Sequence, residues 1–132
     1  MEGAAMNDLH QQLKDDPYLK FLGIEVDAAV DGHAVCSLTI AEHMLNFLGA
    51  VHGGLIFSLA DAAFSAASNS DWSPSFALDV SGSFLKSVRP GDRITADAVR
   101  INTTKRTGLY RMNVRHNEDL IATFNGTVFR KV

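Results

Sequence analysis

Apolar and polar residues alternate along much of the chain with a period near two, which is typical of β-strands. This alternation predicts strands at residues 24–31 and 33–40, joined by the two-residue hairpin signal Asp31-Gly32. Four further strands are expected later in the chain, at residues 76–88, 93–103, 109–115 and 120–129.

Helical spacing replaces the alternation in three places. The longest is residues 53–69, where apolar residues at 3–4 spacing form one stripe: Ile56, Leu59, Ala60, Ala63 and Ala67. A short helix over residues 8–14 is expected behind an Asn7 cap, and a second one runs from Pro17 to a stop at Gly23. One long helix among six strands predicts an α+β fold in which an antiparallel sheet wraps around that helix.

Length and composition narrow the class of protein. With 132 residues, the chain is expected to form one domain over residues 1–132. The net charge of −3 and the lack of any Lys/Arg run of five argue against nucleic acid as a partner. The single cysteine, Cys36, cannot form an internal disulfide, and the N-terminus does not resemble a secretory signal, so a cytoplasmic location is expected.

A membrane span is also disfavoured. The most apolar window, residues 44–68, is interrupted by His52, the Gly53-Gly54 pair and Asp61. Its unbroken apolar pieces are far shorter than the ~20 residues that a bilayer requires. No zinc-like spacing of histidine and cysteine occurs, so no metal or cofactor is expected.

The residues most suggestive of chemistry lie between positions 46 and 61. Gly53 and Gly54 stand at the predicted start of the long helix, where backbone N–H groups are free and the helix dipole is positive. Such N–H groups can stabilise a developing oxyanion. Asp61 lies two turns further on in an alanine-rich run, although aspartate favours caps and turns over helix interiors.

Purely structural interpretations of these residues remain open at this stage. Asp61 can belong to a solvated polar stripe with Ser58 and Ser65, and Asn46 alone fits an amide that caps a loop. His52 can also be a structural histidine. The glycine pair can mark a turn or close packing, which is compatible with holding an anion because both need bare backbone.

Together these residues form a pattern that resembles the hotdog-fold thioesterases, and most closely the PaaI-type branch associated with phenylacetate breakdown. The pattern comprises Asn46, His52-Gly53-Gly54, Phe57-Ser58-Leu59-Ala60-Asp61, Ala63-Phe64 and Asn69-Ser70. Leu22-Gly23-Ile24 and Arg89-Pro90-Gly91-Asp92 extend the resemblance to nearly the whole chain.

The resemblance implies a role for each matching residue. Asp61 is expected to act as nucleophile or as the general base that activates water, and the sequence does not choose between them. The Gly53 N–H is expected to polarise the thioester carbonyl, with Asn46 placing that carbonyl or the water. His52 is expected to position the leaving sulfur or to shape the pocket. Relatives often carry a hydroxyl residue at the position of Ala77, so that role is unassigned, with Ser75 and Ser81 nearby.

Further substrate contacts are expected from Gly54 and Phe57. An acyl-CoA substrate carries phosphates, so basic residues should lie near the mouth of the site. The candidates are Lys86, Arg89, Arg100, Lys105 and Arg106.

Helix geometry makes a further prediction that is independent of any family. Gly53 and Asp61 are eight residues apart, roughly 12 Å along a helix axis. A carbonyl must lie about 3 Å from its donor, and a base equally close to its water. One helix can hardly supply both groups to one thioester, so the prediction is a two-fold dimer with two shared sites. A homotetramer is also expected, although helix geometry does not bear on how dimers pair.

The resulting interpretation is an acyl-CoA thioesterase acting on an aromatic acyl group of the phenylacetyl or hydroxyphenylacetyl type. Medium-chain or other aromatic acyl-CoA substrates are the alternatives within that activity. A non-catalytic acyl-CoA-binding module is the second class, disfavoured by the intact Asp61. A hotdog dehydratase fits less well, because it needs a His/Asp pair acting on a β-hydroxyacyl chain.

Overall fold

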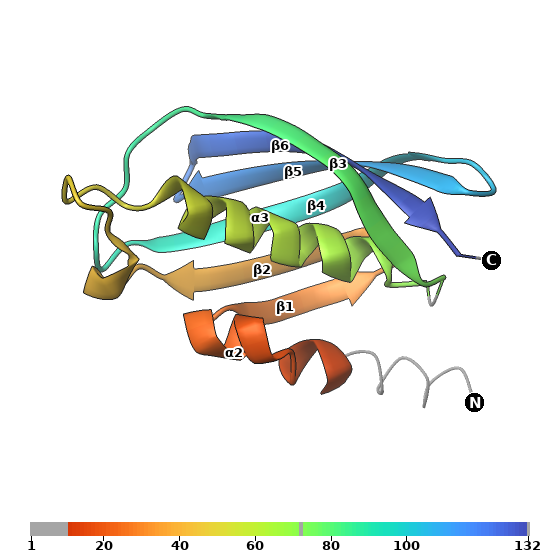
Figure 1. Cartoon of the computed structure of the whole chain (residues 1–132), viewed down its shortest axis with the longest axis horizontal. Helices are drawn as coiled ribbons and strands as arrows, with labels where there is room; N and C mark the ends of the chain where they lie inside the picture. Colours follow the sequence, from red (N-terminus) through yellow and green to blue (C-terminus); the bar gives the residue numbers. More distant parts are fainter. Residues whose placement is uncertain (1–10, 72, 132) are drawn as a thin grey trace.

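The computed structural model describes residues 11–71 and 73–131. Six antiparallel strands form one sheet in the order β1-β2-β4-β5-β6-β3, and a long helix lies across its concave face (Figure 1). The predicted antiparallel sheet wrapped around one helix is confirmed. The strands are β1 (Glu25–Val30), β2 (His33–Thr39), β3 (Ser75–Phe84), β4 (Arg93–Thr103), β5 (Thr107–His116) and β6 (Asp119–Arg130).

The central helix, α3 (Gly53–Ser68), begins at the predicted glycine. Its stripe of Ile56, Leu59, Ala60, Ala63 and Ala67 is buried against the sheet. The small alanine side chains let the helix axis approach the strands closely. Ser68, which the spacing places on the polar stripe, is also buried, and its hydroxyl donates to the Ser65 carbonyl.

Two shorter helical segments precede the sheet. Helix α2 (Pro17–Leu22) is capped by the Asp16 carboxylate, and Gly23 ends it in the left-handed conformation with φ 74°. Of the expected helix over residues 8–14, residues 11–14 are helical, whereas Asn7 and residues 8–10 lie outside the described part of the chain. None of the helices described is long and apolar enough to cross a bilayer.

The hairpin between β1 and β2 follows the sequence signal. Asp31 has φ 49° and Gly32 has φ 80°, the positive pair that a tight two-residue hairpin turn requires. The Gly32 N–H also donates to the Ser70 hydroxyl at 2.7 Å, which ties this hairpin to the end of α3.

The strand expected over residues 76–88 is shorter than predicted, because β3 ends at Phe84. The N–H groups of Leu85 and Lys86 both reach the Ile121 carbonyl, at 2.8 and 3.2 Å, so the regular ladder with β6 stops there. Residues 85–92 then form a loop beside the start of α3. The loop contains the apolar residues Leu85 and Val88, which continue the apolar pattern of a strand in the sequence. In the structure they line a hollow and do not belong to the sheet.

Residues 41–51, expected to be irregular, contain the short 3-10 helix η1 (Glu42–Met44). An isolated antiparallel bridge joins Leu45 to Val51 and closes a small loop between them. This loop delivers the chain to the start of α3.

Candidate active site

Among the described residues, the start of α3 presents one backbone donor without an acceptor. His52 is the N-cap, and its Nδ1 accepts the Gly54 N–H at 2.9 Å. The His52 carbonyl accepts the N–H groups of Leu55 and Ile56. Within the described residues the Gly53 N–H has no acceptor, so it points out of the positive end of the helix dipole.

His52 therefore caps the start of α3, which is the structural role considered for it from the sequence. An Nδ1 that accepts a hydrogen bond belongs to a neutral imidazole protonated on Nε2. The ring lines a hollow under α2, on a different side of the helix start from the Gly53 hollow. Gly54 lies in the same α2 hollow, so His52 and Gly54 both lie away from the hollow that contains Gly53.

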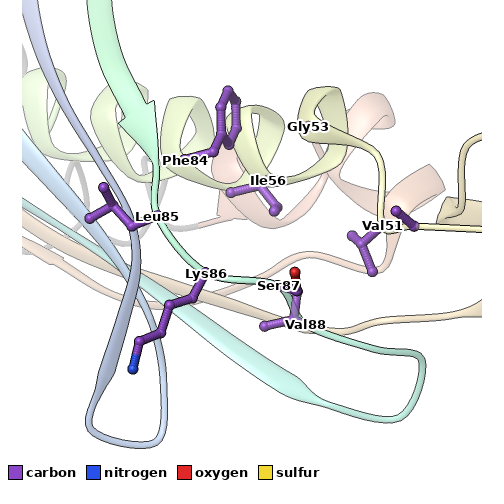
Figure 2. Close-up of a pocket in the computed structure, with 9 residues that line it drawn as sticks. Val51, Gly53, Ile56, Phe84, Leu85, Lys86, Ser87 and Val88 are labelled. Carbon is purple, nitrogen blue, oxygen red and sulfur yellow. The ribbon is translucent and has the colours of Figure 1, made fainter.

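Gly53 lines a hollow of about 410 Å³, shown in Figure 2. Its walls come from the loop before α3, from the first turn of α3 and from the chain after β3. The lining residues are Ala50, Val51, Gly53, Ile56, Phe84, Leu85, Lys86, Ser87 and Val88. A donor N–H at the edge of a hollow is the arrangement that an oxyanion-binding site requires.

The Asn46 side chain organises the loop that leads to this hollow. Its Oδ1 accepts the N–H groups of Leu48 and Ala50 at 2.9 and 3.1 Å. Its own backbone N–H donates to the Ala50 carbonyl at 2.7 Å. The loop-capping role considered for Asn46 is therefore present, and its Oδ1 is occupied by the backbone.

Asp61 lines a second, smaller hollow of about 190 Å³. The other lining residues come from α3, β3 and β6: Phe64, Ser65, Ser68, Ser75, Ala77 and Val128. No hydrogen bond or ion pair reaches the Asp61 carboxylate from the residues that the structure describes. Partial burial raises the pKa of this carboxyl, and the negative charge of Asp16 at the start of α2 raises it further.

Ala77 has no hydroxyl, although relatives often carry a hydroxyl residue at this position. Three serines line the same hollow: Ser65, Ser68 and Ser75. Ser75 lines it from the start of β3, and its hydroxyl donates to the Ser73 carbonyl at 2.9 Å. Ser81 lies elsewhere, in a polar hollow with Arg111 and Asn125. Of the two neighbours expected from sequence, only Ser75 therefore accompanies Asp61.

The raised pKa can be measured directly. In an NMR titration of the carboxyl carbon, the pKa of Asp61 is expected above the ordinary aspartate value of about 3.9. Asp16→Asn keeps a good helix cap but removes the negative charge, so it should lower the pKa of Asp61. Asp15→Asn is the matched control and should leave it unchanged, since Asp15 does not act on Asp61. An unaltered Asp61 titration in Asp16→Asn would contradict this interpretation.

The expected basic residues separate into different regions. Lys86 lines the Gly53 hollow and contacts Asp119 at 3.1 Å, while Arg89 is exposed on the loop after β3. Lys105 and Arg106 lie in the turn between β4 and β5, where the Arg106 carbonyl accepts the N–H of Arg130, a residue paired with the start of β3. Within one chain they are therefore at the opposite end of β3 from Lys86.

Arg100, by contrast, is committed within the fold. Its guanidinium donates to the Tyr110 hydroxyl at 3.0 Å and to Asp71 at 2.8 Å. It is therefore not a free phosphate ligand. These partners could not be predicted from local sequence, because they lie on other parts of the chain.

Sequence reasoning did not single out Phe84, the side chain closest to Gly53 across the hollow. Phe84 ends β3, and only the pairing of β3 with β6 brings it beside α3. Phe57, which was expected to contact substrate, is partly exposed and packs edge-on against Phe124.

Comparison with known proteins agrees with this architecture. The profile of the thioesterase superfamily matches residues 48–123. The acyl-coenzyme A thioesterase PaaI of Escherichia coli is 34% identical over 131 residues, covering 98% of this chain and 94% of the relative.

Two solved structures extend the comparison. The E. coli PaaI structure superposes with a TM-score of 0.91 at 33% identity, covering 97% of this chain and 94% of that one. A variant of the phenylacetic acid degradation protein PaaI from Thermus thermophilus superposes with a TM-score of 0.84 at 37% identity, covering 87% and 99%. This chain therefore belongs to the thioesterase superfamily, as a thioester hydrolase with the hotdog fold.

Proposed function

We propose that this protein hydrolyses acyl-CoA thioesters, with an aromatic acyl group of the phenylacetyl type as the preferred substrate. The observation that carries the proposal is the free Gly53 N–H at the start of α3, facing a hollow. The similarity to an acyl-coenzyme A thioesterase and to a phenylacetic acid degradation protein supports the choice of substrate.

In this mechanism the thioester carbonyl oxygen accepts the Gly53 N–H, and the bond strengthens as negative charge develops on that oxygen. Asp61 either removes a proton from the attacking water or attacks the carbonyl carbon itself. In the first case, the tetrahedral intermediate collapses to the free acid and expels CoA thiolate, which takes the proton from Asp61. In the second case, attack expels CoA thiolate and leaves a mixed anhydride on Asp61, which water then hydrolyses to the free acid and the regenerated carboxylate. Asn46 holds the loop before α3, and His52 holds the Gly54 N–H, so both contribute by keeping the Gly53 donor in place.

The two groups do not meet within one chain. Gly53 and Asp61 line separate hollows, about 12 Å apart along α3 by the helical rise. Strand β3 borders both hollows, with Phe84 beside Gly53 and with Ser75 and Ala77 beside Asp61.

Strand β3 also offers the surface for association. It pairs with β6 on one side only, so its other edge is unpaired within the described sheet. Phe76 and Leu78 are each more than half exposed along it. Antiparallel pairing of two β3 edges about a two-fold axis would place the Ser75 end of one strand beside the Phe84 end of the other. Asp61 of the partner subunit would then approach Gly53.

The same pairing brings the separated basic residues to one site. Lys86 and Arg89 lie at the Gly53 end, and Lys105 and Arg106 of the partner subunit would lie near them. These residues are our candidates for contacts with the CoA phosphates. Val99 and Leu109 are partly exposed on the sheet face opposite α3, which supports pairing of dimers into a homotetramer.

A cytoplasmic location completes the proposal. Cys36 is a buried free thiol, and burial raises its pKa to about 12, so the thiolate is scarce at neutral pH. The fold therefore needs no disulfide at this position, in agreement with a reducing compartment.

Mixed dimers test the shared site. Gly53→Pro and Asp61→Asn variants, each inactive alone, are mixed in equal amounts, unfolded and refolded together, and assayed for thiol release from phenylacetyl-CoA. Half of the dimers are then mixed and hold one intact site, so about a quarter of wild-type activity is expected. Wild type taken through the same cycle is the control.

The outcomes separate the alternatives clearly. No recovery in the mixture, with full recovery of the wild type, would mean that the two groups act within one chain or not together. Tight acyl-CoA binding by the wild type with no turnover would instead favour a non-catalytic binding module.

A further inference from the structure

We infer that Phe84 determines the acyl preference of this protein, by presenting its ring to an aromatic acyl group beside the Gly53 N–H. The inference rests on the proposed acyl-CoA hydrolysis and adds the residue that selects among acyl groups.

The Phe84 ring contacts the start of α3 directly. A Cβ added at Gly53 would lie 3.3 Å from Phe84 Cζ, so the ring edge lies against the glycine backbone. Figure 2 shows the ring standing beside the first turns of α3, on the same side as Gly53 and Ile56. The side chain is nevertheless 55% exposed, which leaves ring surface available to a ligand.

Other aromatic residues hold the Phe84 ring from behind. Phe124 meets it edge to face, with centroids 5.6 Å apart and planes at 80°. Phe124 is 4% exposed and meets Phe57 on its other side at 5.8 Å. Gly82 allows this arrangement, because a Cβ there would collide with the Phe124 ring. Phe84 is therefore supported by a packed ring while another part of its surface stays open.

The polarity of the hollow determines which part of the substrate faces Phe84. Ile56 and Phe84 form an apolar side, whereas Lys86 and Ser87 follow on the chain that leaves β3. In Figure 2 the Lys86 side chain extends away from α3, on the opposite side of Ile56 from the Phe84 ring. The CoA arm carries amides and phosphates and suits the Lys86 side, so the acyl group is directed toward Phe84.

Distances permit ring contact at that position. The carbonyl oxygen lies about 3 Å from its N–H donor. In an arylacetyl group the ring is attached one methylene beyond the carbonyl carbon, so it can reach Phe84 at the roughly 4.5–7 Å centroid separation of aromatic pairs. A straight alkyl chain fills the same space without the edge-to-face interaction.

The test is the ratio of kcat/KM for phenylacetyl-CoA to kcat/KM for hexanoyl-CoA. Phe84→Leu keeps an apolar side chain but removes the ring, and the ratio is expected to fall about 2- to 12-fold, the range for one aromatic pair. Phe84→Tyr restores the ring and should restore most of the ratio. Melting temperatures of both variants establish that they are folded.

Phe21→Leu is the matched control, because Phe21 is an exposed ring on α2 that lines the separate hollow with His52. Its ratio should equal that of the wild type. A ratio unchanged in Phe84→Leu, or a fall in Phe21→Leu instead, would overturn the inference while leaving acyl-CoA hydrolysis intact. Absence of hydrolysis of both substrates by the wild type would instead reject the proposed function itself.

Discussion

Replacing Asp61 with asparagine is expected to lower kcat for acyl-CoA hydrolysis by about 10²- to 10⁴-fold, the usual contribution of a positioned acid or base. Asparagine has nearly the same shape but can neither accept the proton from water nor attack the carbonyl. KM should change much less, because Asp61 is not proposed to contact the CoA arm. The measurement is steady-state thiol release from phenylacetyl-CoA.

Thermal unfolding supplies the folding control for this variant. Burial raises the pKa of the Asp61 carboxyl in the folded chain. A group with a raised folded pKa favours folding below its unfolded pKa and loses that contribution as pH rises through the folded value. Asp61→Asn should therefore melt no lower than the wild type at neutral pH. A variant with nearly full activity would remove Asp61 from the mechanism.

Matched replacement of Ser65 shows whether the loss is specific to the carboxylate. Ser65 lies one turn after Asp61, is exposed, and lines the same hollow. Ser65→Ala is expected to change kcat by only a few-fold, since its hydroxyl is not assigned a chemical step. After a single turnover in ¹⁸O-labelled water, label in Asp61 would identify attack by its carboxylate, followed by water attack at the Asp61 carbon of the mixed anhydride.

Gly53→Pro is expected to reduce kcat by about 10²- to 10³-fold, as the loss of one oxyanion donor does elsewhere. Proline removes the backbone N–H yet fits the first position of a helix. His52 before it already has φ −64° and ψ 131°, the extended conformation that a residue preceding proline favours. The substitution therefore deletes the donor with little demand on the backbone.

Gly53→Ala is the matched control, because it adds a Cβ and keeps the N–H. That Cβ would lie 3.3 Å from the end of the Phe84 ring, so a small shift of the ring is expected. Gly53→Ala should therefore retain much more activity than Gly53→Pro. Equal losses in the two variants would show that space at position 53 matters and that the N–H does not.

Local features of this fold could be predicted because they depend on neighbouring residues. The glycine that starts α3 and the Asp31-Gly32 hairpin are encoded within a few positions, and the structure has both. Strand β4 (Arg93–Thr103) has the predicted ends. The end of β3 could not be predicted, because apolar residues of the following loop continue the strand pattern while facing a hollow.

In the candidate site, too, some residues could be predicted from the sequence and others could not. The sequence identified Gly53 and Asp61 and the helical distance between them. It did not identify Phe84 as a neighbour of Gly53, and it grouped Lys86 with Lys105 although they lie at opposite ends of β3. Alternation shows which face of a strand is buried, but it does not show which strand lies next to which.

The local sequence and the tertiary structure therefore determine different features of this protein. The sequence by itself determined the helix with a free donor at its start and an acid two turns later, because helical rise and capping act over a few residues. Only the tertiary structure decided that β3 borders both groups as an edge strand, that Asp61 is partly buried without a partner among the described residues, and that an aromatic ring lies against the donor. Those features arise from the pairing of β3 with β6, whose partner residues lie 38 (Phe84 and Ala122) to 55 (Ser75 and Arg130) positions apart in the chain. No local pattern encodes the order of these strands in the sheet.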